Sequence, residues 1–329
     1  MSEAGTGSTA WRIARICLVA LLWGVGSYLL LEWARPAEGL VSVSFAVVQP
    51  AAINAFIACL ADPHARRPLS FYLLVPVMSA MGMIVVAAFV LREGVICIAM
   101  LAPLWIVFGM AGTGAAYKLR EANRRLDEGD TFRVHALIVL PFLVMPLEAQ
   151  LPLPQDHYTV TRAVVIDAPA EAIWPLMQGM GEVRTDEGQW NVSQSLLGLP
   201  RPQSASLLGE GLGATRHARW QRGVAFDEVV TDWQPSRRIG WRFDFTGSQG
   251  WEITDPHLRP DGPHMVIESG GYELVPLADG RNLLRLHTSY TAHSHFNGYA
   301  SLWGELFLGD VQANVLEIIR QRAEGHPAR

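Results

Sequence analysis

Lysine is almost absent from this sequence of 329 residues, and cysteine is scarce. The one lysine is Lys118, and the three cysteines, Cys17, Cys59 and Cys97, all lie in uncharged segments near the N-terminus. Residues 154–329 therefore hold neither a thiol nucleophile nor a lysine that could form a Schiff base. They also hold no disulfide framework and no cysteine zinc site. These chemistries are excluded for the second half of the chain.

Charge is scarce as well. Lys, Arg, Asp and Glu make up 17% of the residues, whereas hydrophobic residues make up 50%. Such a composition is too apolar for an ordinary soluble protein. Residues 154–329 carry 15 basic and 21 acidic side chains and no basic patch. This half of the chain is therefore not expected to bind nucleic acid.

Long uncharged stretches fill the first 153 residues. Three of them, 39–61, 68–91 and 94–117, are 23 or 24 residues long. At 1.5 Å per helical residue, each can cross a hydrocarbon core of about 30 Å. None contains Asp, Glu, Lys or Arg, which favours an anchor or a packed bundle over an ion-coupled transporter. We predict transmembrane helices at about 11–33, 39–61, 69–91, 94–117 and 134–151.

The fifth segment is the least regular of these. It contains Pro141 and Pro146 and ends near Glu148. A stretch this short is alternatively a re-entrant or interfacial helix. The side of the membrane on which the second half lies depends on this segment, because that half is outside if the segment spans and inside if it does not.

Basic residues in the loops predict the orientation. If the N-terminus is cytoplasmic, the N-terminal tail and the loops at 62–67 and 118–133 carry nine basic residues, and the opposite side carries Arg35 and Arg92. Cytoplasmic loops of membrane proteins carry an excess of Lys and Arg. We therefore predict a cytoplasmic N-terminus and a second half on the outer side of the membrane.

From residue 154 onward, apolar runs are short and turn sequences separate them. Alternation of apolar and polar residues predicts strands at about 158–166, 203–208, 213–221, 224–233, 238–246, 264–276 and 282–291. Helices are predicted at about 167–180 and from Tyr299 to about Ala323. We thus predict an all-α transmembrane bundle at 1–153 and an α+β domain at 154–329, with a curved antiparallel sheet around a long C-terminal helix.

Three segments of the second domain resemble the START-like, or SRPBCC, superfamily, whose members have the helix-grip fold. They are Val164–Leu176, a strand followed by Ala-Pro and a helix with Ile-Trp, the hairpin Phe226–Trp241, and the terminal helix from Tyr299 to Arg322. The arrangement also resembles bacterial proteins that join several membrane spans to such a domain, which implies a multi-pass protein of the inner membrane. The superfamily includes carriers, polyketide cyclases and dehydrases, and binding modules, so the resemblance implies no single reaction.

The resemblance also implies a hydrophobic cavity between sheet and helix. The residues expected to line it face inward from the strands or from the terminal helix: Phe226, Glu228, Trp241, Phe243, Tyr272, Tyr290, Trp303 and Phe307. Apolar walls with a few polar groups are typical of small-molecule pockets, so the expected partner is a lipid or another hydrophobic small molecule. The alternative is a filled core, because aromatic rows on a sheet commonly serve packing.

Glu228 is the polar member of this set. It shares strand parity with Phe226 and Val230 and is therefore expected to face inward. A buried carboxylate there would have a raised pKa and could act as a general acid or base, or hold a polar group of the ligand. The alternative is a structural ion pair with an arginine such as Arg216.

No other pattern predicts a metal, a cofactor or a catalytic residue. His257 and His264 flank a loop rich in Pro and Gly, and three more histidines lie near the last strand, but none has a recognised zinc spacing. The glycines of 209–213 precede a strand and not a helix, which indicates a hairpin turn and not a phosphate loop. The side chains left for acid–base chemistry are Glu228, Glu268, His217, His287, Tyr272 and Tyr290.

The sequence therefore favours a membrane-tethered binding domain that acts as a carrier or sensor of a hydrophobic molecule. Two alternatives remain open: an enzyme of the cyclase, dehydrase or hydrolase type, and a protein-interaction module.

Overall fold

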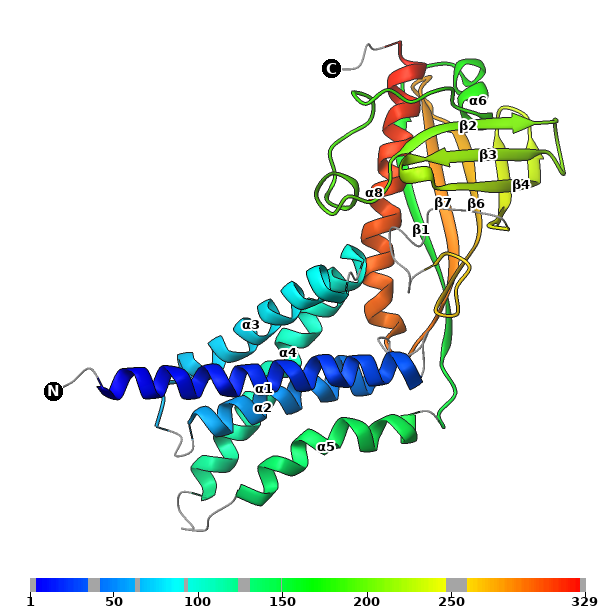
Figure 1. Ribbon diagram of the computed structural model, residues 1–329. Helices are drawn as coiled ribbons and strands as arrows, with labels where there is room; N and C mark the ends of the chain where they lie inside the picture. The colour runs from blue at the N-terminus through cyan, green and yellow to red at the C-terminus, as the bar shows by residue number, and fades with distance from the viewer. Residues whose placement is uncertain are drawn as a thin grey trace. The chain divides into compact units, whose positions relative to one another are not determined.

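The computed structural model describes residues 4–34, 42–62, 66–91, 94–123, 131–148, 150–246 and 259–325. The chain divides into two compact units (Figure 1). The helical unit comprises Met1–Glu93 and Cys97–Leu153, and the sheet unit comprises Pro154–Arg329 together with the short segment Gly94–Ile96. The division after Leu153 falls in the linker that is punctuated by Pro152 and Pro154.

Five α-helices build the part of the helical unit that the structure describes. They are α1 (Ala4–Ala34), α2 (Gln49–Ala61), α3 (Leu69–Val86), α4 (Val95–Asn123) and α5 (Thr131–Glu148), with π-helical turns η2 (Ser44–Val48) before α2 and η3 (Ala87–Leu91) after α3. Among the described residues, three helical runs are long and apolar enough to cross a membrane: Ser44–Ala61, Leu69–Phe89 and Val95–Ala122. Leu18–Leu30 and Val139–Glu148 are shorter apolar runs.

Helix α2 is the buried helix of this unit. Most of its residues have little exposed surface, whereas α3 and α4 expose large apolar side chains such as Leu74, Met78 and Val107. Glycine permits the close approach of α4 to α2, because a Cβ atom on Gly112 would lie 2.1 Å from the carbonyl oxygen of Ala51.

Glu148 joins the end of α5 to the start of η2. Its carboxylate accepts hydrogen bonds from the backbone N–H of Val43 at 2.5 Å, from the N–H of Ser44 at 3.0 Å and from the Ser44 hydroxyl at 2.9 Å. Free N–H groups and the helix dipole favour a negative charge at a helix N-terminus. The carboxylate that interrupts the fifth apolar stretch therefore stabilises the start of the buried helix.

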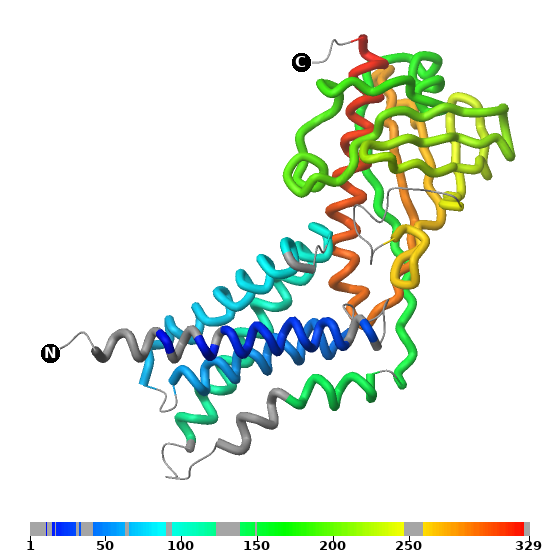
Figure 2. Tube along the Cα trace, in the orientation of Figure 1, coloured from blue at the N-terminus to red at the C-terminus, as the bar shows by residue number. Residues whose placement is uncertain are grey.

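The described part of the sheet unit forms one sheet of seven antiparallel strands. They are β1 (Gln155–Ile166), β2 (Pro202–Leu208), β3 (Thr215–Trp220), β4 (Ala225–Gln234), β5 (Arg238–Asp244), β6 (Met265–Pro276) and β7 (Asn282–His293), in the order β1-β7-β6-β5-β4-β3-β2. The chain runs from β2 to β7 through successive neighbours, which can be followed in Figure 2. The long helix α8 (Asn297–Ala323) follows, and α6 (Ala170–Gln178) and η4 (Val192–Leu196) precede β2. The predicted antiparallel sheet with a long C-terminal helix is confirmed, and it is consistent with a helix-grip domain.

The sheet is strongly curved, and β2, β3 and β4 run across the direction of β6 and β7 in Figure 1. Register shifts between Val230 and Asp232 and between Ile267 and Ser269 interrupt the pairing of β4 and β6 with their neighbours. Such bulges bend a strand and increase its twist. Helix α8 packs mainly on β1 and β7, so it covers one side of the curved face.

The two halves of α8 have different surroundings. Leu316, Ile318 and Ile319 in the second half are completely buried in the main core of the sheet unit. In the first half, Tyr299, Trp303 and Phe307 are only partly buried. The second half therefore holds the helix on the sheet, and the first half presents aromatic rings whose surfaces remain partly accessible.

The first prediction concerns the approach of α8 to β7 at Gly304. A Cβ atom at this position would lie 2.2 Å from the hydroxyl oxygen of Tyr290, whose ring is buried and cannot move freely. We expect Gly304→Ala to lower the free energy of unfolding by about 1–3 kcal/mol, as overpacking does. Gly298→Ala, at a position of α8 with no heavy atom within 4 Å of the new Cβ, should change it by less than about 1 kcal/mol. Chemical denaturation measures the free energy of unfolding of both variants. Equal losses in Gly304→Ala and Gly298→Ala would contradict the close approach of α8 to Tyr290.

Candidate functional site

The strand residues predicted to line a cavity all lie on the sheet face that carries α8, which we call the inner face. Cross-strand pairing aligns Arg216 with Glu228, Glu228 with Phe243 and Val230 with Trp241. Since side chains alternate along a strand, these residues share one face with Tyr272 and Tyr290. Trp303 and Phe307 lie on the first half of α8. The six strand residues of the predicted set therefore share the inner face.

Arg216 and Glu228 form a buried ion pair on the inner face. The residues are Cα partners on β3 and β4, only 4% and 5% exposed, and Nη1 of Arg216 donates to Oε2 of Glu228. Nε of Arg216 donates to the carbonyl oxygen of Gln178 at the end of α6, at 3.2 Å. Glu228 faces inward as predicted, and the structure shows the alternative in which Arg216 is its partner.

Two aromatic rings enclose the arginine of this pair. The guanidinium carbon of Arg216 lies 5.3 Å from the ring centroid of Trp241 and 5.8 Å from that of Tyr272. Both distances allow a cation–π interaction. Burial raises the pKa of Glu228 above its ordinary value against the opposing effect of the Arg216 charge, and burial also raises the pKa of Tyr272. The carboxylate of Glu228 is thus held by a cation and is not a free acid facing a ligand.

The eight predicted lining residues do not form a single cluster. Trp241 and Tyr272 belong to the main core, which also contains Ile166 and Ile239. Phe226 and Phe245 belong to a second cluster, with ring centroids 5.6 Å apart. Phe243 packs against both clusters, and its ring centroid lies 5.8 Å from that of Phe226 and 6.2 Å from that of Trp241. Tyr290 lies in a third cluster and stacks on Tyr158 at 5.5 Å.

The rings of α8 form a separate row. Tyr299 and Trp303 are 6.3 Å apart between centroids, and Trp303 and Phe307 are 5.5 Å apart. The inner face and α8 therefore each present a row of aromatic rings, and the rings of α8 and of Phe243 are only partly buried.

Three buried polar atoms on the inner face and α8 have no hydrogen-bond partner among the described residues. They are Trp241 Nε1, the Tyr290 hydroxyl and Gln312 Oε1. Their residues are only 2–3% exposed. Because more than nine in ten buried polar groups in proteins are paired, three unpaired atoms in one region need an explanation.

These polar atoms come from neighbouring positions of the fold. Gln312 Nε2 donates to Thr288 Oγ1 at 3.0 Å and to the Val160 carbonyl at 3.1 Å, which fixes the direction of its amide. Thr288 is the Cα partner of Gly270, and a Cβ atom on Gly270 would lie 3.0 Å from Trp241 Nε1. Tyr290 is two residues from Thr288 on the same face of β7. A donor, an acceptor and a hydroxyl therefore lie along one stretch of β5, β6, β7 and α8.

Gln312 was missed in the sequence, although a signal for it exists. It is the polar member of a helical stripe that otherwise contains Leu308, Val315, Leu316 and Ile319. A lone amide on the buried side of an amphipathic helix indicates a specific hydrogen bond, which here holds α8 to β1 and β7.

The remaining acid–base candidates lie on the opposite, outer face of the sheet. His217 Nδ1 lies 2.5 Å from Asp227 Oδ1, and Glu268 accepts from the Thr291 hydroxyl at 2.5 Å. His287 is also on this face, and burial lowers its pKa below the ordinary value. His217 and His287 project from odd positions of the strand pairing that places Glu228 inward. Glu268 lies at the register shift of β6, and its carboxylate is bound to Thr291, which is also at an odd position.

The histidine-rich segment gives no metal centre within the described part of the chain. Among these residues no group of three or more His, Cys, Asp or Glu side chains could hold an ion. His264 is buried with Nδ1 3.2 Å from the carbonyl oxygen of His293, and Asp261 pairs with Arg259. Asp255 and His257 lie outside the described residues. Gly209–Gly213 forms the turn between β2 and β3, which confirms the predicted hairpin.

Comparison with known proteins gives a limited result. No family model and no curated protein matches the sequence. Similar solved structures include a protein from Nitrosospira multiformis (19% identity, TM-score 0.27, 47% of this chain and 94% of that one). Another is the Zhui aromatase/cyclase from Streptomyces sp. R1128 (15% identity, TM-score 0.31, 51% of this chain and 94% of that one). A third is a truncated norcoclaurine synthase from Thalictrum flavum (10% identity, TM-score 0.30, 52% of this chain and 96% of that one). At these TM-scores the likeness assigns neither a family nor a function to this chain.

The second prediction concerns the buried ion pair. Removing one partner leaves an uncompensated buried charge, so Glu228→Gln and Arg216→Met should each lower the free energy of unfolding by about 3–5 kcal/mol. The double variant should lose much less than the sum, because it buries no unpaired charge. Denaturant unfolding of all four proteins gives the coupling energy. Additive losses would show that the two side chains do not depend on each other.

Proposed function

We propose that residues 154–329 bind a hydrophobic small molecule that carries a polar group, and that the N-terminal helices tether this domain to a membrane. The proposal makes the protein a carrier or sensor of such a molecule. It also makes the chain a membrane-anchored member of the START-like superfamily, which the three sequence segments and the sheet-plus-helix topology support.

The observation that carries the proposal is the set of unpaired polar atoms between the inner face and α8. Leaving a buried donor or acceptor unpaired costs roughly 1–3 kcal/mol. Trp241 Nε1 can donate, Gln312 Oε1 can accept and the Tyr290 hydroxyl can do both. A ligand with a hydroxyl or carbonyl group would satisfy these atoms, and the aromatic rows would contact its apolar part.

The ligand would reach these atoms after a small adjustment of the side chains around them. Each of the three atoms has less than 1 Å² of accessible surface, so the present packing leaves no open path to it. The first half of α8 is the element best suited to move, because its rings are partly exposed while the second half is fixed in the core. Opening of this half would separate Trp303 and Phe307 from the sheet without breaking the main core.

The third prediction tests the polar contact. The full chain is extracted in mild detergent and bound molecules are measured by native mass spectrometry and organic extraction. Wild type should retain a hydrophobic molecule, and Trp241→Phe should retain about three- to tenfold less at equal protein concentration, as expected for the loss of one hydrogen bond.

Trp233→Phe is the matched control, because Trp233 packs on Trp174 at 5.2 Å and its nitrogen is not among the buried unpaired atoms of the described residues. Absence of any molecule from the wild type would refute ligand binding. Equal retention by the two variants would refute the role of Trp241 Nε1.

Catalysis on the same ligand is the second candidate function, and the buried Glu228 favours it. A positioned general acid or base contributes about 10²- to 10⁴-fold to a rate. The pairing with Arg216 instead favours binding without turnover. Conversion of the recovered molecule by the wild type, and its loss in Glu228→Gln, would establish an enzyme.

The membrane tether rests on the three long apolar helices and on the leucines and methionines that they expose. The fourth prediction concerns its topology. With five spans and the positive loops inside, a reporter fused after Asp156 should be active only outside the cytoplasm. A fusion after Arg67, in a loop predicted to be cytoplasmic, is the control and should give the opposite result. Cytoplasmic activity of the first fusion would show that 134–150 does not cross.

A further inference from the structure

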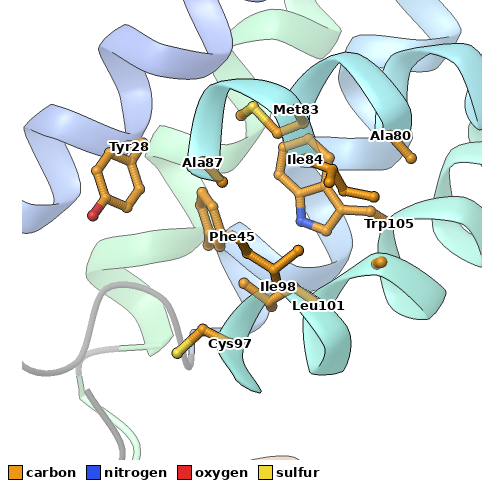
Figure 3. A pocket seen from close by; sticks show the side chains of 11 residues that line it. Tyr28, Phe45, Ala80, Met83, Ile84, Ala87, Cys97, Ile98, Leu101 and Trp105 are labelled. Atoms are coloured by element: carbon orange, nitrogen blue, oxygen red, sulfur yellow. The ribbon is translucent and has the colours of Figure 1, made fainter. Parts of the chain in front are cut away.

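The helical unit contains an apolar cavity of its own. It has a volume of about 50 Å³ and lies among α1, η2, α3, η3 and α4 (Figure 3). The cavity is partly open to its surroundings, so a molecule longer than the enclosed space can enter it with one end. All of the side chains that line it belong to the helical unit, and the cavity is therefore separate from the inner face of the sheet.

Almost all of the cavity wall is apolar. Phe45 and Trp105 form one side, with ring centroids 5.5 Å apart, and Met83, Ile84 and Leu101 contribute aliphatic surface. Figure 3 shows the indole nitrogen of Trp105 on the edge of its ring that faces Phe45 and Ile98.

The nitrogen of Trp105 is the polar atom of interest in this wall. Trp105 is 5% exposed, and its Nε1 has no hydrogen-bond partner among the described residues. Asn54 Nδ2, by contrast, donates to the Pro50 carbonyl at 2.8 Å, and the Thr113 hydroxyl donates to the Tyr72 carbonyl at 2.8 Å, whereas Gln49 Oε1 is also without a partner among the described residues. An indole N–H can only donate, so its partner must be an acceptor.

A buried water typically makes two to four hydrogen bonds, which a wall that is almost entirely apolar does not supply. Apolar cavities in proteins accordingly stay dry and accept apolar molecules. An occupant with one acceptor oxygen and no donor can accept a hydrogen bond from the indole N–H. Methylene groups on both sides of that oxygen can contact the apolar wall.

We propose that this cavity binds an apolar carbonyl compound, whose carbonyl oxygen accepts a hydrogen bond from Trp105 Nε1. Because Nε1 has less than 1 Å² of accessible surface, the oxygen reaches it when a flexible neighbour yields. Met83 is suited to this role, since its unbranched side chain lines the cavity and adapts readily. The site is independent of the ligand proposed for the sheet unit.

Cys97 supplies a reporter, because its side chain lines the cavity. The full chain carrying Cys17→Ser and Cys59→Ala is placed in nanodiscs of saturated phosphatidylcholine. Alkylation of Cys97 by N-ethylmaleimide is followed by intact-protein mass spectrometry, with 2-decanone or with undecane as the competitor. The two competitors have similar size and differ in the carbonyl oxygen.

We expect 2-decanone to slow the alkylation at a concentration about three- to tenfold lower than undecane, as one hydrogen bond predicts. Trp105→Phe, which removes the N–H and keeps a ring, should abolish this difference. Ala102→Leu should fill the cavity and abolish protection by both competitors. Ala88→Leu, at an exposed position of η3 that does not line the cavity, is the control. In this variant both competitors should still protect Cys97 from alkylation.

Equal protection by the two competitors in the wild type would overturn the carbonyl assignment without the use of any variant. Absence of protection by either competitor would overturn the site itself. Neither result affects the proposal that the sheet unit binds a ligand. That proposal is tested separately, by comparing the molecules recovered from the wild type and from Trp241→Phe.

Discussion

The inner face of the sheet depends on the ion pair of Arg216 and Glu228. Two opposite charges on adjacent strands, both withdrawn from water, fix the register of β3 and β4, because any slip would separate a buried charge from its partner. Arg216 also donates a hydrogen bond to the Gln178 carbonyl at the end of α6. Its guanidinium group makes cation–π contacts with the rings of Trp241 and Tyr272. The core next to the proposed ligand site is therefore organised around one charged contact and not around hydrophobic packing alone.

Alternation with period two is a local property of a strand, and it predicts Glu228 on the same face as Phe226 and Val230. Parity within one strand does not reveal which side chains of different strands meet. That depends on the register between distant segments, including the shifts in β4 and β6. The sequence suggested Arg216 as a partner of Glu228, but only the register of β3 against β4 selects it over other arginines.

In the helical unit, too, the helices can be predicted from the sequence but the contacts between distant residues cannot. Long uncharged stretches predict helices from composition alone, and the structure has helices at the five expected places. Nothing local shows that α2 is the buried helix, or that Glu148 binds the backbone of Val43 and Ser44 more than 100 residues earlier. In the sequence this carboxylate looks like an obstacle to a membrane span. In the fold it is an N-terminal cap supplied by another helix.

Buried polar groups of this protein fall into two kinds. Those that join elements, such as Glu148, Asn54 and the amide nitrogen of Gln312, are paired. Those that are unpaired within the described chain include Trp105 Nε1 beside an apolar cavity and Trp241 Nε1 beside the aromatic inner face. Each such atom costs about 1–3 kcal/mol, a large share of a typical stability of 5–15 kcal/mol. An occupant that satisfies the atom recovers that free energy on binding, so an unpaired donor in an apolar wall disfavours the empty state and favours a ligand with a matching acceptor.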